Sequence, residues 1–471
     1  MEGPFDMQRL SHRIRGISAL TLGVLLLSAC GGGSSANDMD GSPPPPPPAI
    51  VSFTSAANAV HVGENTQLTA VFNGDEANID GIGPVQSGVP VATTALASTT
   101  TFRLEVKRGS QHFESQLVID VSYQDQFRTL APAPVAYTQH VAVALADGGA
   151  LVMGGNTSES PNVPDADSSM RFDPLTEIFL PGPQLALTAQ AEFTTPVALP
   201  AGGLLLVGPG INSALHLEGG FRATQAFDAS SGAFHQVGDL ALPHDGGGSV
   251  TGLDNGEVLV AGGNIPASSA AERYDTATGQ WRAAANMNVS RRGHTATRLA
   301  DARVLIAGGV TCCGTTGDIF TGTAEIYDPR TDVFQPTGSL STPRGFHAAT
   351  LLLDGRVLLT GGFVTIQGAT TASAEIYDPA TGQFTPAGTL QTGRSAHSAI
   401  RLTDGRVLVL GGIQATAATD IFDPRTDTWK AGPTAALANA STATLLRNGK
   451  VLIFGGENAS GFPIAKAMLF E

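Results

Sequence analysis

Short apolar runs alternate with turn residues along most of the chain, and the clearest example lies between Pro343 and Leu390. Two apolar runs, His347–Leu353 and Arg356–Thr360, are joined by an Asp-Gly pair, which accepts the positive φ of a tight type I′ hairpin. Ala374–Tyr377 is predicted to be a third strand, because an Asp-Pro turn signal follows it, and Phe384 begins a fourth. Such a four-stranded antiparallel sheet exposes two faces and two edges, so it needs neighbours to be stable.

The unit recurs with strict spacing. The aromatic residue of the fourth strand precedes the next histidine by 13 residues, and a glycine follows that histidine after 14 more; the three clearest sets are Trp281/His294/Gly308, Phe334/His347/Gly361 and Phe384/His397/Gly411. Glycine pairs, some of them incomplete, begin at positions 154, 208, 262, 308, 361, 411 and 455, so successive pairs are 44 to 54 residues apart. A period near 50 residues with four strands per unit is typical of the blades of a β-propeller.

The repeat resembles the kelch repeat in four features of each unit: an Arg-x-x-His before the first strand, the Gly-Gly after the second, a Tyr-Asp that ends the third, and the aromatic residue of the fourth. The matching residues are Arg291/His294, Arg344/His347 and Arg394/His397; Tyr274-Asp275, Tyr327-Asp328 and Tyr377-Asp378; and Trp281, Phe334, Phe384 and Trp429. The resemblance covers residues 124–471 and implies an all-β fold, a seven-bladed kelch-type β-propeller. The unit at Thr188–Gly238 has no Arg-x-x-His, so six blades with this unit as an insertion stay an alternative, which its ordinary length disfavours.

The two ends of the repeat region complement each other. The last unit stops at Phe470-Glu471, after its third strand, while Phe127 precedes His140 by the same 13 residues as in the central units. Residues 124–130 are therefore predicted to supply the missing fourth strand by pairing with Ala465–Phe470. This pairing would remove an open edge and join the last blade to the first.

The N-terminal segment is predicted to be a targeting signal. Residues 1–29 contain three arginines and then the apolar run Ile17–Leu27, which is too short for an ordinary membrane span. The run ends in Leu-Ser-Ala-Cys, which resembles the lipobox of bacterial lipoproteins and implies cleavage before Cys30 and lipidation of its thiol. The alternative is a plain secretory signal. Gly31 after the cysteine implies an outer-membrane lipoprotein, secreted across the inner membrane, if the source is Gram-negative.

Two further segments precede the repeats. Residues 30–49 are rich in glycine, serine and proline and are predicted to be a tether. Residues 50–123 carry apolar residues at every second position, which predicts a small β-sandwich. It resembles the bacterial immunoglobulin-like domains that act as spacers, and a spacer role is favoured over ligand binding. The clearest alternations are Leu68/Ala70/Phe72, Phe102/Leu104/Val106 and Leu117/Ile119/Val121.

Charge and recurrent histidines restrict the function. The net charge of −15 argues against nucleic acid as a partner, because a phosphate-binding surface is basic. Four histidines that recur at one repeat position suggest a metal, but equivalent residues of different blades form a ring rather than a cluster. A packing role is favoured, and no metal or other cofactor is expected. The four are His140, His294, His347 and His397.

Arginines beside these histidines are candidate ligand-binding residues. Arg291, Arg292, Arg344 and Arg394 are expected near one mouth of the central channel, where the kelch resemblance implies contacts with acidic ligands. The alternative is that each arginine bonds loop carbonyls or an acid within the propeller.

A cysteine pair lies in one of the loops that follow the Gly-Gly pairs. Cys312-Cys313 are predicted to form a vicinal disulfide outside the cytosol, and two free thiols or an intermolecular disulfide are the alternatives.

Together these features predict a non-enzymatic binding module of the cell envelope. Its partner is expected to be a protein or a glycan, its membrane contact only the N-terminal lipid, and its state a monomer. No catalytic residue is assigned, because three of the five tyrosines belong to the repeat and no nucleophile motif occurs outside it. The alternative is a carbohydrate-active or galactose-oxidase-like enzyme with its site at the mouth of the channel.

Overall fold

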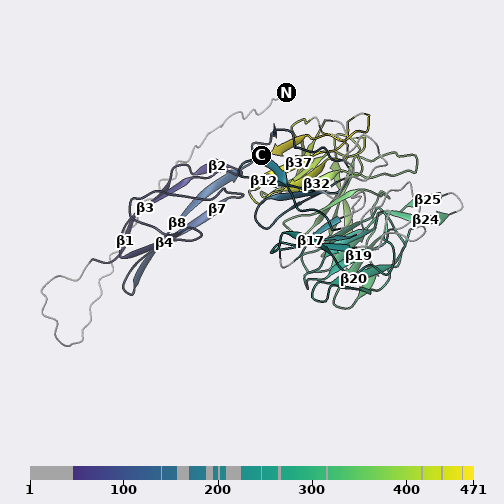
Figure 1. Cartoon of the computed structure of the whole chain (residues 1–471), viewed down its shortest axis with the longest axis horizontal. Coiled ribbons are helices and arrows are strands. Elements are labelled where there is room, and N and C mark those ends of the chain that lie inside the picture. Colours follow the sequence, from purple (N-terminus) through teal and green to yellow (C-terminus); the bar gives the residue numbers. More distant parts are fainter. Residues whose placement is uncertain are drawn as a thin grey trace, which may run out of the picture. The chain divides into compact units, whose positions relative to one another are not determined.

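The computed structural model contains strands and no helix within the residues it describes (Figure 1). No described segment is a helix of the length and hydrophobicity that would cross a membrane. Residues 47–471 form one compact unit. The signal segment, Cys30 and most of the tether lie outside the described residues. The structure describes residues 46–138, 140–155, 169–186, 195–199, 202–207, 224–244, 247–263, 267–314, 317–414, 417–435, 437, 439–458 and 460–471.

The region before the repeats contains two sheets, with the strand orders β1-β3-β6 and β2-β8-β7-β4-β5. The predicted alternation is confirmed in β7, where Phe102, Leu104 and Val106 are buried while Arg103 is exposed. A core of buried residues, Leu68 and Ile79 among them, belongs to both sheets. The strands are β1 (Ala49–Ser55), β2 (Ala59–His61), β3 (Gln67–Asn73), β4 (Glu76–Ile79), β5 (Gly83–Pro84), β6 (Val91–Ala92), β7 (Thr100–Arg108) and β8 (Gln111–Ser122).

The repeats form seven four-stranded antiparallel sheets among the described residues, which we number 1 to 7. The weakest repeat also forms such a sheet, sheet 2. Sheets 1 to 3 contain β10 (Val141–Ala144), β11 (Ala150–Met153), β12 (Ser169–Asp173) and β13 (Ile178–Pro181); β14 (Thr195–Ala198), β15 (Leu204–Val207), β16 (Thr224–Asp228) and β17 (Ala233–Gln236); and β18 (Ser249–Gly252), β19 (Val258–Ala261), β20 (Ala271–Asp275) and β21 (Gln280–Ala283).

Sheet 4 carries an additional hairpin, β24 (Val310–Gly314) with β25 (Gly317–Phe320), where the sequence indicated only a loop after the Gly-Gly pair. Sheets 4 to 7 contain β22 (Thr295–Arg298), β23 (Val304–Ala307), β26 (Ala324–Asp328) and β27 (Val333–Pro336); β28 (Ala348–Leu351), β29 (Val357–Thr360), β30 (Ser373–Asp378) and β31 (Gln383–Thr389); β32 (Ser398–Arg401), β33 (Val407–Leu410), β34 (Asp420–Asp423) and β35 (Thr428–Ala431); and β36 (Thr442–Leu445), β37 (Val451–Phe454), β38 (Ala467–Phe470) and β9 (Phe127–Thr129).

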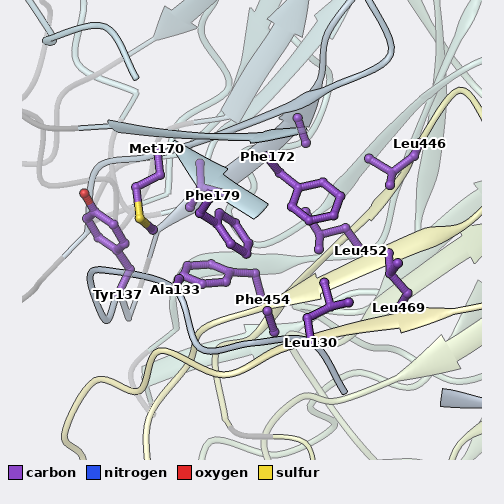
Figure 2. Close-up of a cluster of buried hydrophobic side chains, with 13 residues drawn as sticks. Leu130, Ala133, Tyr137, Met170, Phe172, Phe179, Leu446, Leu452, Phe454 and Leu469 are labelled. Carbon is purple, nitrogen blue, oxygen red and sulfur yellow. The ribbon is translucent and has the colours of Figure 1, made fainter. Parts of the chain in front are cut away.

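The sheets bury one another. Every residue of each second strand is buried, which requires a neighbour on both faces of the sheet. The first strand of each sheet contacts the first strand of the next, from β10 to β36, and β36 contacts β10. Figure 2 shows one shared core, in which Met170, Phe172 and Phe179 of sheet 1 pack with Phe454 and Leu469 of sheet 7.

Sheet 7 combines strands from both ends of the repeat region. β9 pairs with β38, and Phe127 lies opposite Phe470, with their ring centroids 5.2 Å apart. Asp125, just before β9, has a φ of 55°, and the turn residue at the same position in six other sheets also has a positive φ. Residues 127–129 thus occupy the fourth-strand position that the spacing predicted for them. The equivalent turn residues are Glu177, Gly232, Gly279, Asp332, Gly382 and Asp427.

Candidate functional site

The arginines of the Arg-x-x-His motifs are buried inside the sheets. The side chains of Arg291, Arg344 and Arg394 are 0% exposed. Arg291 Nη2 donates to Glu325 Oε1 at 2.8 Å, and its Nη1 donates to the carbonyl of Gly308 at 2.8 Å. Burial lowers the pKa of Arg291, and the Glu325 carboxylate opposes that shift. In sheets 5 and 6 the pairs are Arg344 Nη2 with Glu375 Oε1 (2.9 Å) and Arg394 Nη2 with Asp420 Oδ2 (3.2 Å).

The same carboxylates bind the loop that enters each sheet. Glu375 accepts hydrogen bonds from the backbone N–H groups of Ser341 and Thr342, at 2.8 and 3.2 Å. Each arginine–acid pair therefore clamps the incoming loop onto the third strand, and we call these three pairs the arginine clamps. The expectation that Arg291, Arg344 and Arg394 bind a ligand is corrected, because their guanidinium groups are enclosed and already paired. The bonds that they make to loop carbonyls and to an acid are those that the alternative expected.

Arg292 differs from the other three arginines because it is only half-buried. Its guanidinium carbon lies 6.0 Å from the centroid of the Phe346 ring, within the range of a cation–π contact. Phe346 has a φ of 53°, which is costly for a bulky side chain, and its N–H donates to the carbonyl of Gly293 at 2.7 Å. Among the four candidate arginines, only Arg292 keeps access to the surface.

The recurrent histidines connect neighbouring sheets. His294 Nε2 lies 2.9 Å from Ser249 Oγ of the preceding sheet, and His140 Nε2 of sheet 1 lies 2.8 Å from Thr442 Oγ1 of sheet 7. Burial lowers the pKa of His140, His294 and His397 to about 3, so these rings are neutral at ordinary pH.

The first glycine of four Gly-Gly pairs leaves room for these rings. A Cβ on Gly262 would lie 2.7 Å from His294 Cε1, and one on Gly455 would lie 2.5 Å from His140 Cε1. This close approach explains the pairing of glycine and histidine in the repeat. No group of three metal-ligand residues occurs in the part of the chain that the structure describes.

Sheet 3 uses a histidine where sheets 4 to 6 use an arginine, and sequence reasoning missed it. His244 Nδ1 lies 2.7 Å from the carbonyl oxygen of Gly262, and its Nε2 lies 3.2 Å from Glu272 Oε1. Glu272 occupies the same position in β20 as Glu325 in β26. Glu272 without an arginine upstream was the signal in the sequence that another basic residue, His244, pairs with it.

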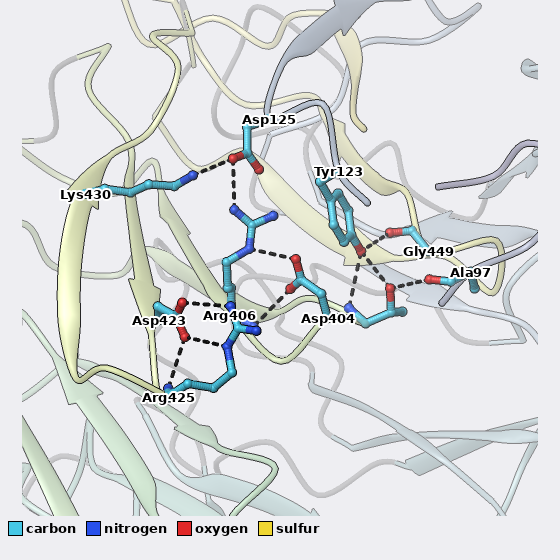
Figure 3. Close-up of polar contacts among 10 residues, drawn as sticks. Ala97, Tyr123, Asp125, Asp404, Arg406, Asp423, Arg425, Lys430 and Gly449 are labelled. Carbon is cyan, nitrogen blue, oxygen red and sulfur yellow. Dashed lines mark hydrogen bonds and ion pairs between the residues drawn. The ribbon is translucent and has the colours of Figure 1, made fainter. Parts of the chain in front are cut away.

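The two ends of the sheets differ in polarity. The turns after the first and third strands form what we call the ionic rim, where Asp-x-Arg sequences make ion pairs within a turn and to the next sheet. Arg356 bonds Asp354 at 2.8 Å and Asp427 of sheet 6 at 2.9 Å. Arg406 likewise bonds Asp404 at 2.7 Å and Asp125 of sheet 7 at 2.8 Å (Figure 3).

The opposite end carries the loops between second and third strands and the loops that enter the first strands, and we call it the apolar rim. A groove of about 490 Å³ lies between the β24–β25 hairpin and residues 364–367. None of its lining residues is ionisable: Ile319, Phe320, Thr342, Pro343, Val364, Thr365, Ile366 and Gln367. Among the side chains that the structure describes, sheets 4 to 7 each expose one large apolar side chain here: Ile319 (49%), Ile366 (56%), Ile413 (45%) and Phe462 (39%).

The region before the repeats is hydrogen-bonded to turns of the ionic rim. The Tyr123 hydroxyl donates to the Gly449 carbonyl at 2.5 Å and lies 3.1 Å from Thr403 Oγ1. Thr403 Oγ1 in turn donates to the carbonyl of Ala97 (Figure 3). Burial raises the pKa of Tyr123, so it remains a neutral donor.

Two predicted sites lie beyond the described side chains. Cys312 and Cys313 belong to β24, but their side chains are outside the described set, so the disulfide stays a prediction. Lipidation of Cys30 likewise stays a prediction.

Comparison with known proteins gives one family match. The Kelch motif matches residues 247–288, which lie in sheet 3 and the loops beside it, so the chain contains a kelch repeat. No curated protein matches the sequence. Among solved structures, a fungal alcohol oxidase of the AA5 family in complex with copper is similar over 59% of this chain and 73% of its own, with 15% identity and a TM-score of 0.40.

Proposed function

We propose that the seven sheets close into a seven-bladed kelch-type propeller and that this propeller is a binding module of the cell envelope. The kelch match, the β9–β38 pairing and the contact between β36 and β10 support the closed ring. In this proposal, residues 30–49 are a tether from a lipidated Cys30, and residues 50–123 are an immunoglobulin-like spacer.

The apolar rim is the proposed docking surface, and a protein is the partner it fits best. The single observation that carries this choice is the contrast between the rims: the apolar rim exposes an isoleucine or phenylalanine on each of four consecutive sheets, beside a groove without charge. Two of these side chains, Ile319 and Ile366, line the same groove, and a clustered exposed apolar patch typically marks a protein–protein contact. The ionic rim instead bonds the spacer through Tyr123.

A matched pair of substitutions tests the docking surface. A photo-crosslinking amino acid at Ile366 is expected to capture a discrete protein in cells that make this chain, whereas one at Leu353, which is 67% exposed on the ionic rim, is expected to capture none. With that partner purified, Ile366→Asp is expected to weaken binding at least about tenfold, as at other buried apolar anchors. Unchanged affinity for Ile366→Asp, or an equal loss for Leu353→Asp, would contradict the proposal.

A glycan array separates the two partner classes that the sequence left open. No saturable glycan binding is expected at the apolar rim. Saturable binding of a glycan that Ile366→Asp abolishes and Leu353→Asp preserves would assign the rim to a sugar instead.

The anchor has its own test. Cells fed a labelled fatty acid are expected to label the wild-type chain and not Cys30→Ala. Equal labelling of both would refute the lipid anchor without affecting the docking surface.

A further inference from the structure

We infer that His244 is held as an imidazolium by two acceptors and makes the entry loop of sheet 3 a pH-sensitive clamp, where sheets 4 to 6 use permanently charged arginines. The inference rests on the geometry around His244 and is independent of the proposed partner.

The hydrogen bonds at His244 require two donors. A neutral imidazole has one N–H and one lone pair, whereas the imidazolium donates from both nitrogens. Here Nδ1 faces the Gly262 carbonyl oxygen at 2.7 Å and Nε2 faces Glu272 Oε1 at 3.2 Å. A carbonyl oxygen only accepts hydrogen bonds. Either neutral tautomer would therefore place a lone pair against one of these oxygens.

Glu272 is an acceptor as well, because backbone donors occupy both of its oxygens. The N–H of Ala241 donates to Oε2 and the N–H of Leu242 to Oε1, each at 2.8 Å. These bonds and the one from His244 lower the pKa of Glu272 although burial opposes the shift. The carboxylate is thus ionised, and the pair with His244 is a buried ion pair whose side chains are 3% and 1% exposed.

Comparison with sheet 4 shows what the histidine replaces. There, Arg291 donates to the Gly308 carbonyl and to Glu325, whose oxygens also accept the N–H groups of Asn288 and Val289. The partners of His244 are the same kinds of group at equivalent positions. The difference is that an arginine stays protonated in proteins, whereas a histidine ordinarily titrates at about pH 6.5.

Among the described residues, the other ionisable groups near His244 do not change charge in that range. His294 is neutral, because burial lowers its pKa to about 3 and the charges of Arg291 and His244 lower it further. Arg291 remains paired with Glu325. The proposal therefore concerns only the proton shared between His244, the Gly262 carbonyl and Glu272. The contribution of His244 to stability is present while it is protonated and is lost as the pH rises.

Loss of the proton acts on the loop that enters sheet 3 at the apolar rim. A neutral His244 leaves Glu272 without its counter-charge and removes one hydrogen bond, so the N–H groups of Ala241 and Leu242 lose part of their support. Because a hydrogen bond to a charged group is lost, the fraction of molecules in which this loop is open is expected to rise on the order of tenfold.

Histidine-selective ¹⁵N NMR of the full chain tests the protonation state directly. The His244 signals are assigned by their absence in His244→Arg, and both nitrogens are expected to carry protons at pH 7. One unprotonated nitrogen at pH 7 would overturn the inference.

Amide hydrogen exchange tests the consequence. After correction for intrinsic rates, Ala241 and Leu242 are expected to exchange about tenfold faster at pH 9 than at pH 6 in the wild type, and equally at both in His244→Arg. Arg291→His is expected to transfer the same pH dependence to Asn288 and Val289, which keeps the test valid if His244→Arg does not fold. Exchange independent of pH in the wild type, or no transfer in Arg291→His, would overturn it.

Discussion

In sheets 4 to 6 and in sheet 1, different side chains occupy the position that joins the incoming loop to the third strand: an ion pair in sheets 4 to 6 and an apolar pair in sheet 1. In sheet 5, a buried Arg344 and Glu375 clamp the incoming loop to the third strand. In sheet 1, Tyr137 occupies the arginine position, because its carbonyl accepts the N–H of Gly456 just as that of Arg344 accepts the N–H of Gly309. Tyr137 and Met170 belong to one buried cluster, with Met170 at the position of the acid (Figure 2).

The contrast indicates that the side chain at this position must fill the space and contact the third strand, but need not be polar. An ion pair fixes the loop through directed bonds and is costly to break on one side only. Sheet 1 also shares its core with sheet 7, so at that seam apolar packing between the ends of the repeat region replaces a clamp.

The largest effect is expected from removing the strand that joins the ends. Deleting residues 467–471 removes β38, whose four residues are all buried, and leaves β9 without a partner. We expect the whole repeat region to lose roughly 5 kcal/mol or more and to unfold in one transition. Calorimetry checks this, and an unchanged thermal midpoint would contradict the role of the seam.

Breaking one clamp is expected to cost less. Arg344→Met leaves the Glu375 carboxylate buried without its counter-charge and should destabilise the chain by about 3–5 kcal/mol. The double variant Arg344→Met with Glu375→Met imitates the apolar solution of sheet 1 and should recover most of the loss. Denaturant unfolding measures both; a double variant as unstable as the single one would show that the clamp cannot be replaced.

The third-largest effect is expected from acid, which should weaken the contact between sheets 1 and 7, the seam. Arg128 bonds lower the pKa of Glu177, and bonds from Arg128 and Lys450 lower that of Glu471 against the effect of burial. Because both carboxylates have lowered pKa values in the folded state, their stabilisation is present at neutral pH and is lost as the pH falls below the usual range of a carboxyl group.

Arg128→Met is the control variant for the effect of acid on the seam. Its thermal midpoint should fall less than that of the wild type between pH 6 and pH 3, because the pairs are already absent. If the thermal midpoints of the two proteins fall equally with pH, these ion pairs do not stabilise the seam.

The smallest effect is expected on the ionic rim. Arg356→Ala removes the pairs with Asp354 and Asp427, but these side chains are partly exposed. Pairs of this kind contribute about 0.2–1 kcal/mol. A loss of the size expected for Arg344→Met would show that the rim, rather than the interior, holds neighbouring sheets together.

The strands of the repeat could be predicted from sequence because each depends on local patterns. The Asp-Gly turn before Arg356 and the strict distance from Phe127 to His140 fix strand boundaries and the partner of β9. The burial of Arg291, Arg344 and Arg394 could not be predicted the same way. A guanidinium group suits an acidic ligand and a buried glutamate equally well, and only the fold places Glu325 opposite Arg291.

His244 was missed for a related reason. Its sequence neighbours do not reproduce the Arg-x-x-His motif, and its role follows from Glu272, 28 residues later. The apolar rim was also hidden, because single exposed residues such as Ile366 or Ile413 are ordinary until loops from several sheets bring them to one end.

A double-mutant cycle between Phe127 and Phe470 tests whether the two ends of the repeat region join, because these residues are 343 positions apart and their rings are in contact only in the joined structure. Phe127→Ala, Phe470→Ala and the double variant are compared by denaturant unfolding. The double variant is expected to lose less stability than the sum of the two single variants, by about 1 kcal/mol for a packed aromatic pair. Strictly additive losses would contradict the joining of the two ends.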